Sequence, residues 1–219
     1  SSTPVLTKNE HQYNRISAKV SIENTIVGYL TILDYQKPFD EDSDIKFASL
    51  LCDVLSAEMQ KSRLNKKTQR ALIEDFMTQL LDKDIKENEI IEERARFLHM
   101  DLKENLYVMS IDVSRFNPLH GPLFYFISLV EDMVSGTTAI IYDKKIVMLI
   151  SRSEDNPLEG KSLNRLKKLL KTNKLKAGLS RCFYNLKDIR SYFRQSVKSL
   201  ELGIREKSKQ VIFGYEDYA

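Results

Sequence analysis

The amino-acid sequence predicts an α+β protein in which helices pack on a mixed β-sheet of the palm or ferredoxin-like type. Three observations predict this class. Strand and helix patterns alternate from residue 106 onward, two adjacent β-rich runs in the middle of this region form a hairpin, and no internal repeat is present. A separate hairpin and a long helical pattern precede this region.

The first third of the chain begins with the pattern of a β-hairpin. Apolar and polar residues alternate over 15–20 and 26–33, and Glu23-Asn24-Thr25 separates the two runs. Gly28 predicts a β-bulge in the second strand, because an isolated glycine within a strand pattern often marks one.

A helix is expected after the hairpin. Acidic residues gather at 40–44, where they suit the positive end of a helix dipole, and Asp42 or Ser43 is the expected cap. Apolar residues then recur every three to four positions, which predicts a helix to about Arg63. The polar and basic residues 62–70 continue this helix as a linker, and we place a domain boundary there.

The apolar period resumes at Ala71 and ends at the charged sequence Asp82-Lys83-Asp84. A second helix is expected from about Glu87. Its expected core residues are Ile90, Ile91, Ala95, Phe97 and Leu98.

The remaining sequence alternates strands and helices. Residues 106–113 are apolar enough for a central strand. A helix follows within 118–136, which Gly136 is expected to cap. Its expected buried residues are Leu123, Phe126, Ile127, Val130 and Met133. The later elements are strands over 137–141 and 146–150, a helix through Leu163 and Leu170, a strand over 175–180, a long helix from Leu186 to Ile204 and a strand over 210–213.

Composition argues against several classes of protein. The net charge of +3 is too small to indicate a nucleic-acid partner by itself. No apolar run approaches the roughly 18 residues of a membrane span. Cys52 and Cys182 stand far apart, as is typical of thiols buried in a reducing cytoplasm. The histidines have no metal-ligand spacing, so neither a metal nor a cofactor is expected.

The hairpin sequence Val27–Ile32, the acidic stretch Phe39–Ile45 and the amphipathic helix after it resemble the closing part of a GAF domain, over about residues 12–62. The resemblance implies a small-molecule sensor of which this chain holds the last hairpin and the last helix. We therefore expect no intact ligand site of that kind within the chain. Because the sequence starts at Ser1 without an initiator methionine, we expect it to be part of a longer protein.

Other stretches resemble the sensor and linker region of the PucR/CdaR family of bacterial transcription regulators, over about residues 70–219. They are Ile73–Leu81, Ile90–Leu98, Tyr107–Val113, Gly178–Ser180, Leu186–Gly203 and Val211–Tyr218. The resemblance implies a degenerate GGDEF-like domain that precedes a C-terminal helix-turn-helix, which would lie beyond Ala219.

The resemblance also implies a nucleotide site, in which a metal-binding carboxylate and a glycine-rich turn are missing. A diguanylate cyclase uses carboxylates to hold divalent metal and a glycine-rich turn to approach the nucleotide. Asp112 matches the first carboxylate of that family's Asp-x-Asp-x-Phe pattern, whereas Ser114 stands where the second would be. The turn Tyr142-Asp143-Lys144-Lys145 contains no glycine. We therefore expect no enzymatic activity.

Two interpretations remain open for these residues. In the first, Asp112 is a strand-end carboxylate that accepts hydrogen bonds from nearby amides, and Asp143 and Lys144 are ordinary turn residues. In the second, a nucleotide or another acid binds here without turnover. The candidate residues for this degenerate site are Asp112, Ser114, Asp143, Lys144 and Lys145.

A second candidate surface is the predicted helix over 161–176, which contains basic residues and no acidic residue. Its basic face consists of Lys161, Arg165, Lys167, Lys168 and Lys171. This face either contacts DNA phosphates or an acidic partner, or is the solvated side of a helix with a leucine stripe. We favour the solvated side, because no aromatic residues alternate with the basic ones.

The sequence thus predicts three regions: the C-terminal part of a GAF-like sensor over 1–62, helical linker and lead-in helices over 63–105, and a degenerate GGDEF-like domain over 106–219. We expect a cytoplasmic, non-enzymatic signal relay for an unknown small-molecule effector, with no membrane contact, and with DNA bound only by a domain beyond Ala219. The helical pattern over 45–81 would carry the signal and pair with its twin in a homodimer. The alternatives are a nucleotide-binding or cyclase-related domain and a free-standing protein-interaction module.

Overall fold

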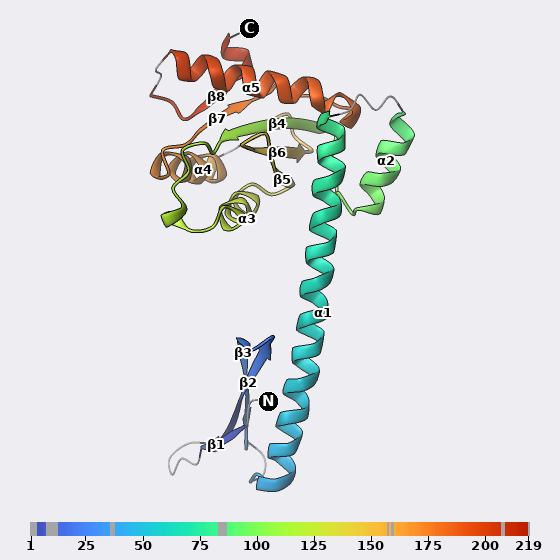
Figure 1. Ribbon diagram of the computed structural model, residues 1–219, viewed down its shortest axis with the longest axis vertical. Helices are drawn as coiled ribbons and strands as arrows, with labels where there is room; N and C mark the ends of the chain where they lie inside the picture. Colours follow the sequence, from blue (N-terminus) through green and yellow to red (C-terminus); the bar gives the residue numbers. More distant parts are fainter. Residues whose placement is uncertain are drawn as a thin grey trace. The chain divides into compact units, whose positions relative to one another are not determined.

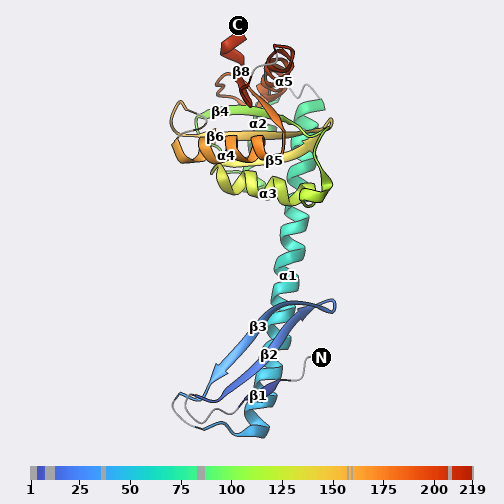
Figure 2. The ribbon, with the colours of Figure 1, turned by 90° about the vertical axis from the view of Figure 1, so that its left-hand side faces the viewer.

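A computed structural model describes residues 4–7, 13–35, 38–82, 87–156, 158, 160–206 and 209–218 (Figures 1 and 2). The chain divides into two compact units, residues 1–70 and 71–219, and each is described by itself. The expected charged break at Lys83-Asp84 lies outside the described residues.

The first unit contains a three-stranded antiparallel sheet, in the order β1-β2-β3, and the first part of helix α1. Its elements are β1 Val5–Thr7, β2 Arg15–Ile22, β3 Thr25–Leu33 and α1 Glu41–Asp82. The sequence pattern missed β1, because three residues are too few to show an alternation. On one face of the sheet, Ala18 and Val20 of β2 pack with Cys52 of α1.

The predicted hairpin of the first unit is confirmed. Glu23 and Asn24 form its turn, with positive φ angles of 46° and 66°. The register of the ladder shifts between Val20 and Ser21, which pair with Gly28 and Ile26 respectively. The predicted bulge therefore lies directly beside Gly28.

Helix α1 runs without interruption from Glu41 to Asp82, so the two predicted helical segments and the linker between them form a single helix. The expected cap at Asp42 or Ser43 is wrong, because the helix begins earlier. Asp40 accepts a hydrogen bond from the amide of Asp42 (3.3 Å), and its own amide donates to the carboxylate of Asp44 (2.8 Å).

The second unit is built on a five-stranded mixed sheet, in the order β5-β6-β4-β7-β8. Its strands are β4 Asn105–Asp112, β5 Thr137–Tyr142, β6 Lys145–Arg152, β7 Lys176–Leu179 and β8 Ile212–Gly214. The central strand β4 is antiparallel to both β6 and β7, whereas β8 runs parallel to β7. The first four strands have the split βαβ order of a ferredoxin-like fold, so the predicted α+β class is confirmed.

Helices cover both faces of this sheet (Figures 1 and 2). They are α2 Asn88–Phe97, α3 Leu123–Met133, α4 Gly160–Thr172 and α5 Ile189–Arg205. One apolar core lies beneath α3 and α4 and includes Met109 and Ile111 of β4. The other contains Leu106 and Val108 of β4 together with residues of α2, α5 and the end of α1. Because strand side chains alternate, β4 contributes to both cores.

Some predicted core and cap residues are wrong. In α2, Ile91, Ala95 and Leu98 form the buried stripe, whereas Ile90 and Phe97 are 48% and 75% exposed. Ile90 and Phe97 each precede a buried residue by one position, and because successive residues of a helix are rotated by about 100°, their side chains lie outside the buried stripe. Other corrections concern element ends: Val134 is the C-cap of α3 in place of Gly136, which lies in the following turn, and the helix expected over 161–176 ends at Thr172.

Both cysteines are free thiols, one in each unit. Cys52 is buried, and this burial, followed by the charge of Asp53, raises the pKa of its thiol. Cys182 is half-buried and its thiol contacts the side-chain oxygen of Asn105 at 3.4 Å. In the described part of the chain, no helix has both the length and the apolar character needed to cross a membrane.

Candidate functional site

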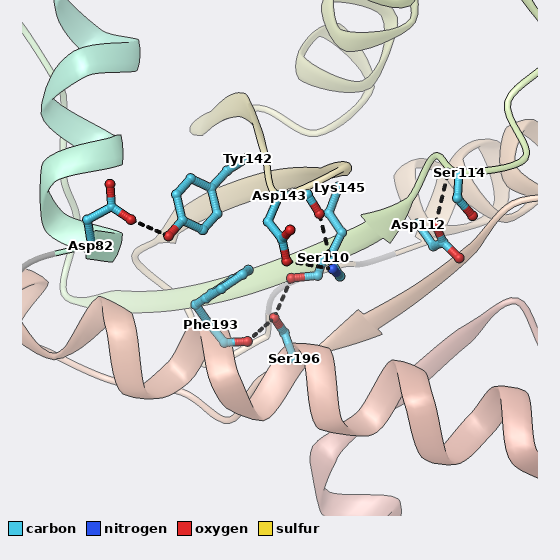
Figure 3. Close-up of polar contacts among 9 residues, drawn as sticks. All are labelled: Asp82, Ser110, Asp112, Ser114, Tyr142, Asp143, Lys145, Phe193 and Ser196. Atoms are coloured by element: carbon cyan, nitrogen blue, oxygen red, sulfur yellow. Dashed lines mark hydrogen bonds and ion pairs between the residues drawn. The ribbon is translucent and has the colours of Figure 1, made fainter.

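The end of β4 and the turn between β5 and β6 lie side by side, so the structure brings the predicted site residues together (Figure 3). Asp112 pairs with Lys145 in the β4–β6 ladder. The amide of Val113 donates to the carbonyl oxygen of Lys144 at 3.4 Å. Asp112, Ser114 and the turn residues thus share one edge of the second unit.

The turn between β5 and β6 is a two-residue hairpin turn formed by Asp143 and Lys144. Both residues have positive φ angles, 45° and 57°, as a type I′ turn requires. The ammonium group of Lys145 donates to the carbonyl oxygen of Asp143 at 3.1 Å and to its carboxylate at 3.2 Å. The sharp turn therefore forms without glycine, and Asp143 is engaged by Lys145.

Asp112 lies between two lysines in the sheet. Its ladder partners are Lys145 on β6 and Lys176 on β7, and side chains directly opposite each other have Cβ atoms about 5 Å apart. Its carboxylate accepts a hydrogen bond from the amide of Ser114 at 2.9 Å. This is the contact expected of a strand-end carboxylate. Lys145 and Lys176 therefore occupy the ladder positions on both sides of Asp112, where a metal site would need further oxygen ligands.

Among the residues that the structure describes, no three or more His, Cys, Asp or Glu side chains are grouped so that they could hold a metal ion.

Sequence reasoning missed a contact that joins the turn to α1. The hydroxyl of Tyr142 donates to the carboxylate of Asp82 at 2.5 Å, and its ring lies edge-on to Phe193 of α5, with centroids 5.5 Å apart (Figure 3). The end of α1, the β5–β6 turn and α5 therefore meet at one aromatic side chain. The partners lie far apart in the sequence, so no local pattern could reveal them.

Replacing Tyr142 with phenylalanine is expected to destabilise the second unit by about 1 kcal/mol at neutral pH. The hydrogen bond to Asp82, followed by burial, raises the pKa of Tyr142 above its usual value of 10.0. The folded state therefore holds the phenol proton more tightly than the unfolded state, and this stabilisation is lost as the pH rises above about 10.

Urea unfolding of both proteins between about pH 9 and pH 11 measures this effect. The stability difference between wild type and Tyr142→Phe should shrink across that range. A difference that stays constant would mean that the hydrogen bond to Asp82 contributes nothing to the titration of Tyr142.

A second missed feature is a buried serine pair between β4 and α5. Ser196 of α5 donates to the carbonyl oxygen of Phe193 at 2.8 Å, so its oxygen accepts from Ser110 of β4 at 2.6 Å (Figure 3). Both side chains are fully buried. Ser199 donates to the carbonyl oxygen of Ser196 at 2.9 Å. The signal in the sequence was the spacing of small residues at Ser196, Ser199 and Gly203.

The basic face lies elsewhere on the second unit. Its five residues, Lys161, Arg165, Lys167, Lys168 and Lys171, are all exposed on α4. The opposite side of α4 buries Leu166 and Leu170 in the core beneath α3 and α4. By strand alternation, Asp112 and Lys145 lie on the other face of the sheet, so the two candidate surfaces do not form one site.

Comparison with known proteins gives one positive finding. A family model described as GGDEF-like domain matches residues 83–202, which is more than half of the chain. The matched segment begins before β4 and contains Asp112 and the β5–β6 turn. No curated protein and no solved structure matches the chain.

Proposed function

This chain belongs to the GGDEF-like domain family, and from this we propose that it is a non-enzymatic signal-relay region of a bacterial transcription regulator. In this proposal, residues 1–62 belong to a GAF-like sensor, 63–105 form the helical linker and lead-in helices, and 106–219 form the degenerate GGDEF-like domain. The region acts in the cytoplasm and couples the sensing of a small molecule to a DNA-binding domain of the same regulator.

The observation that carries the proposal is the continuity of α1. Ala48 and Cys52 are buried on this helix within the first unit, and Phe76 and Leu80 are buried on it within the second. An unbroken helix transmits a rotation or a shift because its hydrogen-bonded backbone has no joint to absorb the movement. A ligand drives such a shift only if it binds the two arrangements with different affinities.

The end of α1 also contacts residues of the second unit that could respond to its movement. Asp82, the last residue of α1, accepts a hydrogen bond from the hydroxyl of Tyr142, and the ring of Tyr142 packs against Phe193 of α5. A displacement of α1 would therefore reach both the β5–β6 turn and α5. We propose that the turn, which in an active cyclase serves the nucleotide, here serves the relay.

The proposal includes a homodimer that forms through α1. Residues 57–69 of this helix are all exposed within the chain. A partner helix would stabilise this segment by burying its apolar side chains, among them Met59 and Leu64.

Insertions into α1 test the relay. Two extra residues after Asn65 rotate the following helix by about 200°, whereas seven extra residues return it to within about 20° of its original direction. In the full-length regulator, the first insertion is expected to abolish the difference between induced and uninduced expression of a reporter gene. The second is expected to retain it. Equal responses from both variants would argue against transmission through α1.

A cyclase-related function is the alternative, and one observation favours it: Asp112 and the β5–β6 turn keep the mutual placement that a nucleotide site would use. Incubation of the chain with GTP and magnesium, followed by chromatography of the products, separates the two proposals. We expect no cyclic dinucleotide, because the carboxylate lies between lysines and the second acidic position is Ser114. Formation of that product would overturn the non-enzymatic proposal.

A further inference from the structure

The side of α1 that faces away from the sheet of the first unit carries an apolar stripe. Phe47, Leu50, Val54 and Leu64 are each more than half exposed. Ala48 and Cys52, which pack against β2, lie on the opposite side of the helix. The sheet of the first unit therefore leaves this stripe uncovered, although such a row of large apolar side chains is costly in water.

The spacing of the stripe is that of a coiled-coil seam. Phe47, Leu50 and Val54 are separated by steps of three and four residues, and Leu64 falls on the same alternating register, with Ala57 and Lys61 at the two positions between Val54 and Leu64. Alternating steps of three and four are the pattern of helices that pack side by side over several turns. We call these positions the seam. Its members are Phe47, Leu50, Val54, Ala57, Lys61, Leu64 and Thr68.

Charge is distributed unevenly along the same helix. Residues 42–58 contain four acidic side chains and one basic side chain, whereas residues 61–70 contain five basic side chains and no acidic one. Two parallel copies of α1 would place like charges together, with Lys61 against its own twin in the seam and Asp53 beside Glu58. Two antiparallel copies would lay the acidic part of each helix along the basic part of the other.

Resting on the proposed homodimer, we propose that α1 pairs through this seam with α1 of a second copy in the antiparallel direction. In the register that aligns the seams, Val54 faces Leu64 of the second copy, and Ala57 faces Lys61. The flanking positions then pair Asp53 with Lys67 of the second copy, and this pair occurs twice because the dimer is symmetric. One like-charge contact remains, between Glu58 and its twin, against three in the parallel arrangement, where Lys61 meets its twin once and the contact between Asp53 and Glu58 occurs twice.

Charge reversal in the full 219-residue chain tests the direction, with dimerisation measured by analytical ultracentrifugation. Asp53→Lys is expected to weaken the antiparallel dimer about tenfold, because it replaces two attractive pairs with repulsive ones. The same change would strengthen a parallel dimer by relieving the repulsion from Glu58. Lys67→Glu should also weaken the antiparallel dimer, and the double variant Asp53→Lys/Lys67→Glu should restore it. Lys66→Glu, which reverses a charge away from the seam, is the matched control and should leave dimerisation unchanged.

Disulfide formation gives a second measure of direction, in chains that carry Cys52→Ala and Cys182→Ser. Val54→Cys and Leu64→Cys chains, when mixed, are expected to cross-link to each other faster than either cross-links to itself. The reverse order of rates would overturn the antiparallel direction and leave the homodimer intact. A wild-type chain that is monomeric at about 10 μM would overturn both the seam and the proposed homodimer, while the insertion experiment on α1 still tests the relay.

Discussion

Replacing Gly178 with alanine is expected to destabilise the second unit by more than about 4 kcal/mol and to abolish its folding in cells. A Cβ atom at this position would lie 2.0 Å from the carbonyl oxygen of Ser196 and 2.6 Å from the amide nitrogen of Leu200. Both atoms belong to the backbone of α5, so no side chain can rotate away to make room. Relief requires α5 to move off β7, which would break the buried hydrogen bond between Ser110 and Ser196.

The matched control is Gly28→Ala on β3. No atom lies within 4 Å of a Cβ built there, and the residue has no positive φ, so the change is expected to cost no more than about 0.5 kcal/mol. The soluble yield of both variants and their urea unfolding curves give the comparison. If Gly178→Ala unfolded within about 1 kcal/mol of wild type, α5 would pack less closely on β7 than the structure indicates.

The close packing of α5 on the sheet is a feature that the hydrophobic pattern of the sequence could not predict. Periodic patterns are carried by large apolar residues, and for this reason β4 and the β5–β6 hairpin were predicted nearly at their observed bounds. The start of the amphipathic α4 was predicted to within one residue, whereas its end at Thr172 lies four residues before the expected one. The stripe of α5 that lies nearest the sheet consists partly of Ser196, Ser199 and Gly203, which a hydrophobicity pattern counts as polar or neutral. Ile204, whose size and type fit the period of this helix, is nevertheless 42% exposed.

Part of the candidate site could likewise be predicted from the sequence, and part of it could not. The resemblance to GGDEF-like domains predicted that Asp112 and the turn at Asp143 belong to one site, and the β4–β6 register places them together. The lysines on either side of Asp112 depend on the registers of two ladders, which no local pattern specifies. The contact between Asp82 and Tyr142 depends in addition on where α1 ends.

Replacing Phe76 with alanine is expected to destabilise the second unit by about 3–5 kcal/mol, because it empties a fully buried site in the core that holds the end of α1. The guanidinium of Arg94 lies over the Phe76 ring, 4.9 Å from its centroid, and also donates to Gln79 at 2.7 Å. The loss of the ring therefore also removes one of the contacts that hold α2 on α1.

Leu72→Ala is the matched control, since Leu72 lies one turn earlier on the same helix and is 45% exposed; its expected cost is below about 1 kcal/mol. Hydrogen exchange of the whole chain gives the decisive measurement. Because Phe76 belongs to the core of the second unit, its loss should lower protection in β4 and leave the amides of β2 as protected as in wild type. An equal loss in β2 would mean that the two units unfold as one. The whole of α1 would then belong to a single cooperative body.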